Sequence, residues 1–199
     1  MPGRIRLITE RVLAGALLVL LGPILLLIMV AIWVDDSGPV FFAQSRVGFQ
    51  GREFLILKFR SMREDPALES GFNPGDIRRV TRVGCLLRNW KLDELPQLIN
   101  VLKGEMSFIG PRPEVRRWVD EYPDIWAEIL AVRPGITDPA AIEFRNEEDL
   151  LRRSEDPNAY YRDVILPRKL SIYRQYLANR SLKSDLIVIL RTFSSVLNR

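Results

Sequence analysis

The chain divides into a long apolar stretch near its N-terminus and a mixed remainder, in which short apolar runs alternate with polar ones. Residues 12–34 contain no charged side chain. A straight helix of that length would be roughly 34 Å long, enough to cross the hydrocarbon core of a bilayer. The run is longer than the apolar region of a cleaved signal peptide. The pattern therefore predicts an uncleaved membrane anchor over residues 1–36, followed by a folded domain over residues 37–199.

A helix-breaking pair, Gly22-Pro23, lies at the centre of the apolar stretch. Proline removes a helical hydrogen bond, so we expect a kink or break there. The cations before the stretch, Arg4, Arg6 and Arg11, favour a cytoplasmic N-terminus. A straight span would then place the domain outside the cytoplasm, whereas a re-entrant helical hairpin bent at Gly22-Pro23 would keep both ends inside. The residues alone leave both arrangements open, because many spanning helices contain proline.

The remaining pattern predicts an α+β domain that is predominantly helical. Alternation of apolar and polar positions predicts strands over residues 40–44 and 54–60. Polar segments rich in Gly and Pro predict loops over residues 62–76 and 104–113. Helical periodicity predicts helices over residues 77–87, 92–102, 114–132, 146–179 with an interruption at Pro157, and 185–197.

Composition narrows the chemistry that this domain can perform. The chain has no histidine and a single cysteine, Cys85. Imidazole catalysis, a disulfide and a thiolate zinc site within one chain are therefore excluded. Acid–base work is left to carboxylates, lysine or tyrosine, and a metal would be a hard ion on oxygen ligands, such as Mg²⁺. Because Cys85 stands between apolar neighbours, we expect a buried structural thiol.

The net charge of +4 suits an anionic membrane, a phosphorylated substrate or nucleic acid. The basic C-terminal region, interleaved with Leu, Ile and Phe, predicts amphipathic helices lying on an anionic leaflet. A solvated basic helix face fits the same pattern. A nucleic-acid-binding module is the weaker alternative, because the basic pairs Arg78-Arg79 and Arg152-Arg153 lack the interleaved aromatic residues typical of such surfaces.

Two adjacent carboxylates, Asp93 and Glu94, open the segment over residues 92–102. Pro96 requires a helix start nearby, which would place Asp93 near an N-cap. The simple interpretation is therefore that Asp93 caps a helix. The alternative uses the same geometry, because a helix N-terminus binds phosphate, and a carboxylate beside a bound phosphate can attack phosphorus to form an acyl phosphate. The two carboxylates would then take separate roles, one as the nucleophile and one on a metal ion.

A diphosphate substrate needs cations to neutralise it. Lys58 and Arg60 share one face of a predicted strand, and Arg88 precedes the carboxylates. Arg112 lies between two prolines, which limit where its side chain can point. We expect these cations to contribute to a phosphate site if the fold brings them together.

Four motifs closely resemble the bacterial sugar transferase family, the monotopic phosphoglycosyl transferases in their minimal catalytic form. They are Lys-Phe-Arg-Ser-Met at 58–62, Leu-Asp-Glu-Leu-Pro-Gln-Leu at 92–98, Asn-Val-Leu-Lys-Gly-Glu-Met-Ser-Phe-Ile-Gly-Pro-Arg-Pro at 100–113 and Val-Arg-Pro-Gly-Ile-Thr at 132–137. The resemblance extends over nearly the whole chain.

The resemblance implies an enzyme that transfers a sugar-1-phosphate from a UDP-sugar to undecaprenyl phosphate and releases UMP. Asp93 would be the nucleophile that carries the phospho-sugar, and Glu94 would bind Mg²⁺ or Mn²⁺. The reaction would begin assembly of a surface glycan on the cytoplasmic face of the bacterial inner membrane. The implied partners are the UDP-sugar, undecaprenyl phosphate and the anionic inner leaflet, but not nucleic acid. A homodimer is left open.

The family pattern also implies roles for residues around the carboxylates. Lys58, Arg88 and Arg112 would surround the phosphates, Arg145 would bind the nucleotide, and Asp185 would support the active site.

One segment departs from the family pattern, at residues 138–144, where Asp-Pro-Ala-Ala-Ile-Glu-Phe replaces a run that begins Gly-Trp or Gly-Leu in many members. We expect this segment to border the sugar or the nucleotide. The rival hypothesis is a signal-anchored domain outside the cytoplasm, which the charge flanks permit but a cytosolic nucleotide-sugar disfavours.

Overall fold

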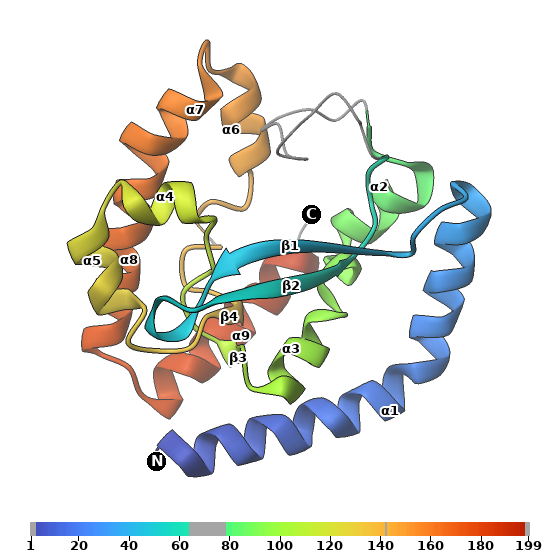
Figure 1. Cartoon of the computed structure of the whole chain (residues 1–199), viewed down its shortest axis with the longest axis horizontal. Helices are drawn as coiled ribbons and strands as arrows, with labels where there is room; N and C mark the ends of the chain where they lie inside the picture. The colour runs from blue at the N-terminus through green and yellow to red at the C-terminus, as the bar shows by residue number, and fades with distance from the viewer. Residues whose placement is uncertain (1–2, 64–78, 142, 198–199) are drawn as a thin grey trace.

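The computed structural model describes residues 3–63, 79–141 and 143–197. They form an α+β fold that is mostly helical, as the sequence predicts (Figure 1). The elements are α1 (Gly3–Asp35), β1 (Phe41–Val47), the 3₁₀ turn η1 (Phe49–Gly51), β2 (Glu53–Phe59), α2 (Arg82–Asn89), the 3₁₀ turn η2 (Leu92–Glu94), α3 (Gln97–Lys103), β3 (Ser107–Ile109), α4 (Arg116–Asp120), α5 (Pro123–Ile129), β4 (Gly135–Thr137), α6 (Glu147–Arg153), α7 (Pro157–Tyr160), the π-helical turn η3 (Tyr161–Ile165), α8 (Leu166–Ala178) and α9 (Leu182–Leu197).

Two small sheets cross the middle of the molecule. Strands β1 and β2 were both predicted, and they pair as an antiparallel hairpin in which Phe41 lies opposite Phe59. Strands β3 and β4 pair in parallel, with Ser107 opposite Gly135. The prediction of a plain loop over residues 104–113 is wrong here. A strand of three residues is too short to show an alternating pattern, and its partner is distant in sequence.

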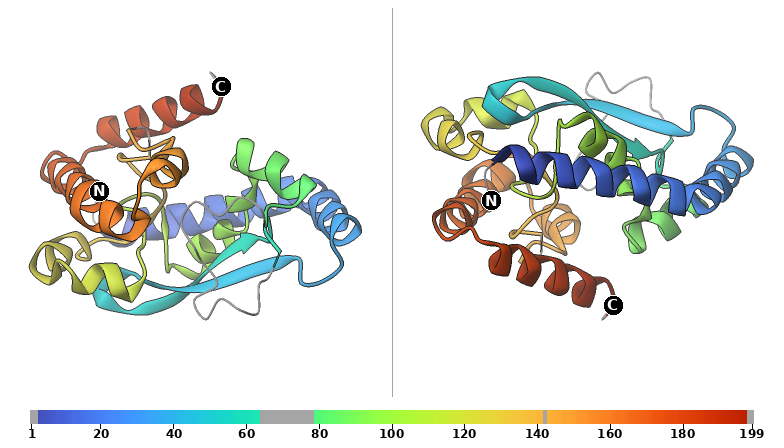
Figure 2. Two further views of the ribbon diagram at one scale, coloured as in Figure 1. Left: turned by 90° about the horizontal axis from the view of Figure 1, so that it is seen from above. Right: turned by 90° about the horizontal axis from the view of Figure 1, so that it is seen from below.

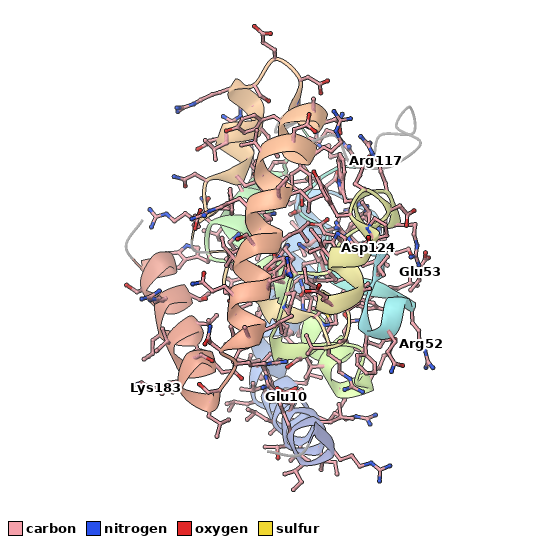
Figure 3. All side chains as sticks on the ribbon, turned by 90° about the vertical axis from the view of Figure 1, so that its left-hand side faces the viewer. Glu10, Arg52, Glu53, Arg117, Asp124 and Lys183 are labelled. Carbon is pink, nitrogen blue, oxygen red and sulfur yellow. The ribbon has the colours of Figure 1, made fainter. Side chains whose placement is uncertain are left out.

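The largest apolar core lies between α4, α5 and α8. Trp126 is almost fully buried and donates its indole N–H to the carbonyl of Trp118 at 3.2 Å. Leu170 and Tyr173 of α8 pack into the same cluster. This core holds α8 rigidly beside the loops that carry polar residues. Charged side chains such as Arg52, Glu53, Arg117 and Asp124 project outward on the side of the molecule away from α9 (Figure 3).

Proline positions divide several predicted helices. The predicted helix over residues 114–132 is two helices, because Pro123 begins α5 and cannot continue α4. The helix predicted over residues 92–102 is split into η2 and α3 around Pro96. The interruption at Pro157 is confirmed, since Pro157 begins α7. From residue 64 onward the loop predicted over residues 62–76 lies outside the described residues.

Helix α1 is apolar yet largely exposed. It is the one helix, among the described residues, that is long and apolar enough to cross a membrane. It runs beneath the domain and then changes direction along its side (Figures 1 and 2). Pro23 lies inside it, and proline is the usual cause of a sharp change in helix direction. Ala14 packs near α3, and Ile28 and Ile32 pack with residues of β2 and α2.

Polar contacts tie both ends of α1 to the same domain. Near its start, Arg6 pairs with Asp185 of α9 at 2.7 Å, and Arg11 donates to the carbonyl of Leu102 at 2.7 Å. At its end, the carboxylate of Asp35 accepts the backbone N–H of Val83 at 2.9 Å. The two halves of the helix are thus held by one folded body.

Candidate active site

A cavity of about 770 Å³ contains most of the predicted site residues. One wall comes from β2, α2 and η2 together with Arg112. The other wall comes from residues 138–152 and Lys169 of α8. The lining carries seven cations (Lys58, Arg88, Lys91, Arg112, Arg145, Arg152 and Lys169) and six carboxylates (Asp93, Glu94, Asp138, Glu147, Glu148 and Asp149). Such a lining suits a charged ligand.

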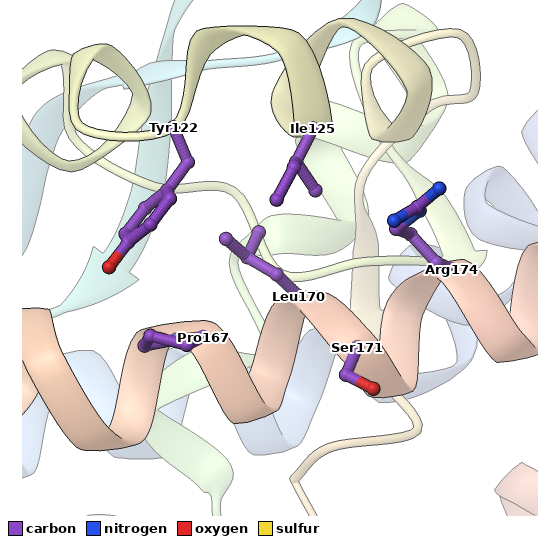
Figure 4. Close-up of a pocket in the computed structure, with 6 residues that line it drawn as sticks. All are labelled: Tyr122, Ile125, Pro167, Leu170, Ser171 and Arg174. Atoms are coloured by element: carbon purple, nitrogen blue, oxygen red, sulfur yellow. The ribbon is translucent and has the colours of Figure 1, made fainter.

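A second, smaller cavity of about 210 Å³ lies between α5 and α8 (Figure 4). Tyr122 and Ile125 face Pro167 and Leu170 across it, and Arg174 lies at one end. It has no carboxylate in its lining and borders the apolar core. The larger cavity is therefore the candidate active site.

Local backbone geometry carries Asp93 and Glu94 to the cavity. Helix α2 begins at the N-cap Thr81, whose hydroxyl accepts the N–H of Gly84 at 2.9 Å. A side chain at Gly84 would meet the carbonyl oxygen of Ser61 at 2.1 Å, so glycine lets α2 approach the chain after β2. Lys91 then adopts the left-handed conformation, with φ of 57°. This turn ends α2 and starts η2, which carries both carboxylates.

Asp93 is buried but weakly bonded. The residue is only 7% exposed, and its Oδ1 accepts no hydrogen bond from any residue that the structure describes. Burial raises the pKa of Asp93, the negative charge of Glu94 adds to this, and the positive charge of Lys58 opposes it. The N-cap position of α3 is Pro96, so Asp93 does not cap that helix. The capping interpretation is therefore wrong for α3.

Glu94 is held firmly by two cations. Its Oε1 accepts hydrogen bonds from Lys58 Nζ at 2.9 Å and from Arg112 Nη2 at 2.6 Å. Burial opposes ionisation, but Arg112 and Lys58 outweigh it and hold the pKa of Glu94 well below its usual range. Glu94 in turn raises the pKa of Arg112, while burial lowers the pKa of Lys58. The adjacent carboxylates thus differ: Glu94 is ion-paired to two cations, whereas Asp93 Oδ1 has no hydrogen-bond partner among the described residues and burial disfavours its ionised form.

The opposite wall is built on ion pairs from the first turn of α6. Glu147 pairs with Lys169 at 2.6 Å, and Glu148 pairs with Arg88 across the cavity. Deeper in the wall, Asp138 Oδ1 accepts the N–H of Ala140 at 2.8 Å and the hydroxyl of Tyr173 at 3.2 Å. Burial raises the pKa of Asp138.

Six of the eight predicted site residues line this cavity. They are Lys58, Arg88, Asp93, Glu94, Arg112 and Arg145. Arg60 and Asp185 do not line it, so the structure does not bring them together with the other six, and their roles stay predictions. Strand β2 ends at Phe59, and the buried Arg60 turns to Asp36 at 3.4 Å. Asp185 instead pairs with Arg6 of α1 and accepts the hydroxyl of Tyr176.

Sequence analysis singled out the segment that contains Asp138 but missed other charged side chains of the cavity, which are Lys91, Arg152, Lys169 and the carboxylates at residues 147–149. Asp138 and Lys169 line it, and both are buried. A charged residue inside an otherwise amphipathic helix, such as Lys169 in α8, is a weak signal because most such residues are exposed. The prediction of a buried structural thiol is wrong, since Cys85 is exposed and lines the cavity. In α2, Gly84 and Leu87 face the protein interior, which turns Cys85 outward.

The donor set of the cavity fits a divalent cation that shares its ligands with a substrate. No group of three or more acidic or thiol side chains able to hold a metal alone occurs in the described ranges. Mg²⁺ is usually bound by one or two carboxylates together with substrate phosphates, and Asp93 and Glu94 supply carboxylates of that kind.

Comparison with known proteins identifies the family of the chain. The model of the family described as "Bacterial sugar transferase" matches residues 3–199, and the chain belongs to this family. It is therefore a transferase, and its apolar N-terminal helix marks it as a membrane protein.

Relatives differ in length and in the sugar that their names give. The exopolysaccharide production protein ExoY of Rhizobium meliloti (strain 1021) is 36% identical over 92% of this chain and 81% of its own. A UDP-glucose:undecaprenyl-phosphate glucose-1-phosphate transferase of Caulobacter vibrioides is 37% identical over 96% of this chain and 68% of its own. A UDP-N-acetylgalactosamine-undecaprenyl-phosphate N-acetylgalactosaminephosphotransferase of Aeromonas hydrophila is 37% identical over 89% of this chain and 40% of its own.

Proposed function

We propose that this protein transfers a sugar-1-phosphate from a UDP-sugar to undecaprenyl phosphate through a covalent intermediate on Asp93. The observation that carries the proposal is the buried, unpaired Oδ1 of Asp93 in a cavity lined by Lys58, Arg88 and Arg112. The names of the relatives supply the substrate class. The name of the exopolysaccharide relative supports a role in the making of a surface glycan.

In the first step, a lone pair of the Asp93 carboxylate attacks the phosphorus that bears the sugar. The bond between that phosphorus and the bridging oxygen breaks, and UMP leaves with the electron pair. Asp93 Oδ1 accepts no hydrogen bond from any described residue, so no such bond must be broken before this oxygen attacks. Arg112 and Lys58, held by Glu94 in the same cavity, would neutralise the charge on the phosphate oxygens.

In the second step, a phosphate oxygen of undecaprenyl phosphate attacks the same phosphorus. The acyl phosphate bond breaks, the Asp93 carboxylate is restored, and the product is a lipid diphosphate sugar. Both steps exchange one phosphorus–oxygen bond for another, so no oxidant or further co-reactant is required. Arg145 and Arg88 lie along the cavity wall, where they suit the nucleotide and its phosphates.

Glu94, with Asp93 beside it, would hold Mg²⁺ or Mn²⁺ at the substrate phosphates, and the ion would supply charge neutralisation there. Several kcal/mol of such stabilisation correspond to about 10²- to 10³-fold in rate. Activity should therefore fall by that factor in excess EDTA and return with added Mg²⁺. Full activity in the chelator would remove the metal role of Glu94.

We propose further that α1 is re-entrant and that both of its ends lie on the cytoplasmic face. The contacts of Arg6 and Asp35 with one domain support this, because a straight span would pull the two ends to opposite sides of the membrane. In a Cys85→Ser background, a single cysteine at Gly3→Cys should resist a membrane-impermeant maleimide added outside the cell. Labelling from outside would contradict the re-entrant arrangement. The further change Pro23→Leu should shift the helix toward a straight span, and the cysteine at position 3 should then react with the maleimide added outside the cell.

The covalent mechanism is tested by trapping the intermediate. The protein is mixed with a UDP-sugar labelled in its sugar, without undecaprenyl phosphate. The label should become attached to the protein, with release of one UMP per active site, and it should map to the peptide that contains Asp93. Addition of undecaprenyl phosphate should then move the label to lipid. Transfer of label to lipid without any labelled protein would reject the covalent step.

A further inference from the structure

Cations of the cavity are already neutralised by carboxylates of the chain itself. The first turn of α6 supplies three consecutive carboxylates, at residues 147–149. Two of them pair with cations of their own wall: Glu147 contacts Lys169 at 2.6 Å, and Asp149 contacts Arg152 at 2.8 Å. These two pairs fix the wall without reaching the carboxylates of η2.

The contact between Glu148 and Arg88 is different, because it joins the two walls. Arg88 belongs to α2, near η2, whereas Glu148 belongs to α6, 60 positions later in the chain. Figure 1 shows α2 and α6 toward the same end of the molecule. The side chain of Arg88 is 25% exposed and that of Glu148 is 55% exposed. The pair therefore bridges the two walls while partly exposed to solvent, so an entering anion can reach it.

A guanidinium binds carboxylate and phosphate with the same planar donor fork. Arg88 cannot make its full set of contacts to Glu148 and to a phosphate at the same time. An anion that enters the cavity must therefore break the contact with Glu148 or leave Arg88 unused.

We propose that Glu148 is an internal competitor for the phosphate group of the ligand. It holds Arg88 across the cavity in the ligand-free protein and is displaced when a phosphate binds. The inference rests on the proposed function in that Arg88 meets the donor, but it concerns anion binding and does not require turnover. Because the competition acts on every phosphate ligand, Glu148 weakens the binding of the donor and also favours the release of the nucleotide product.

The size of the effect follows from the exposure of the pair. Partly exposed ion pairs contribute little, so removing the competitor should tighten anion binding by about two- to fivefold. Salt screens such a pair, and the gain should shrink as ionic strength rises.

The test measures pyrophosphate binding by calorimetry, with the full chain in lipid nanodiscs and a fixed Mg²⁺ concentration. Glu148→Gln should bind pyrophosphate about two- to fivefold more tightly than the wild type, with less difference at high salt. Glu155→Gln is the matched control, because it removes the same charge from an exposed residue that does not line the cavity. It should bind as the wild type does. Equal affinity in Glu148→Gln and wild type, or an equal gain in Glu155→Gln, would overturn the proposal.

A second pair of variants separates Arg88 from the other cations. In an Arg88→Gln background, the further change Glu148→Gln should give no gain in pyrophosphate affinity. A gain that persists there would mean that Glu148 acts on a different group, and the proposal would fall. Pyrophosphate binding to none of the proteins would also overturn it, since the proposal requires an anion site at Arg88. If the variants bind pyrophosphate as expected but no sugar phosphate is transferred, the proposal for Glu148 is supported and the proposed reaction is rejected.

Discussion

The two walls of the cavity differ in how firmly they hold their charges. On the η2 wall, Asp93 and Glu94 are buried, and Glu94 is bonded to two cations from separate parts of the chain. On the α6 wall, Glu148 and Asp149 are exposed and their ion pairs reach into solvent. Bonds between buried groups fix positions, whereas exposed pairs exchange easily with water and with other ions.

This difference suggests a division of labour between the walls. A group that must attack phosphorus needs a fixed position and little solvent, which the η2 wall provides. Groups that admit and release a charged ligand need pairs that break at little cost, which the exposed Glu148 of the α6 wall provides, whereas Asp138 and Lys169 deeper in that wall are buried. Loss of a charge on the first wall should therefore change the rate of chemistry, and loss of a charge on the second should change affinity.

The largest expected effect is that of Asp93→Asn. An amide cannot form the acyl phosphate, so turnover measured by UMP release should fall by on the order of 10⁴-fold or more. Stability should not fall. The folded-state pKa of Asp93 is raised, so its contribution to stability is present at low pH and is lost as pH rises through that pKa. At pH 7 the neutral amide should leave the melting temperature unchanged or higher.

The matched control is Asp149→Asn, the same substitution on the α6 wall. It should alter turnover at saturating substrate by less than about tenfold. Equal losses in the two variants would contradict the division between the walls, and a fully active Asp93→Asn protein would reject the covalent mechanism.

The neighbouring change Glu94→Gln should damage stability as well as activity. It removes the anion between Lys58 and Arg112 and leaves two partly buried cations facing each other. Loss of one partner from a fully buried pair costs about 3–5 kcal/mol, and partial exposure of these cations reduces this to about 2 kcal/mol. Urea denaturation should show that loss for Glu94→Gln but not for Asp93→Asn. Equal free energies of unfolding would mean that Glu94 does not order the wall.

The dependence of the rate on pH should report the ionisation of Asp93. The nucleophile must be ionised, and its pKa is raised by burial. The rate at saturating substrate should therefore fall about tenfold per pH unit below a pKa that lies above the ordinary value for aspartate. Asp138 also has a raised pKa, so Asp138→Asn is the control and should keep the same acid limb. A flat profile down to the pH of unfolding would argue against an ionised Asp93 in the rate-limiting step.

Local signals predicted the η2 wall, and long-range packing produced the rest. Asp93, Glu94 and Arg112 stand in motifs that the sequence displays directly, and all three line the cavity. Strand alternation predicted that Arg60 and Lys58 share one strand face. Strand β2 ends at Phe59, one residue before Arg60, so Arg60 does not follow that alternation. Glu148 carried no signal, because its partner lies 60 positions away. An ion pair between distant helices depends on their packing, which periodicity does not encode.

The smallest expected effect concerns Cys85, whose accessibility reports on one wall of the cavity. The prediction of a buried thiol came from its apolar neighbours, yet it lines the cavity on the α2 side, and it is the only cysteine of the chain. Its alkylation rate therefore reports access to the cavity without an engineered label.

A bound UDP-sugar should slow the reaction of Cys85 with iodoacetamide by about two- to fivefold at saturation. The ligand would cover part of the cavity wall, while the contacts of the thiol with its own helix would not change. Free uridine should protect less, since it lacks the phosphates that the cations around Cys85 would hold. Mass spectrometry of the peptide that contains Cys85 measures both rates. Equal alkylation with and without UDP-sugar, at a concentration that saturates UMP release, would place the donor away from the α2 wall.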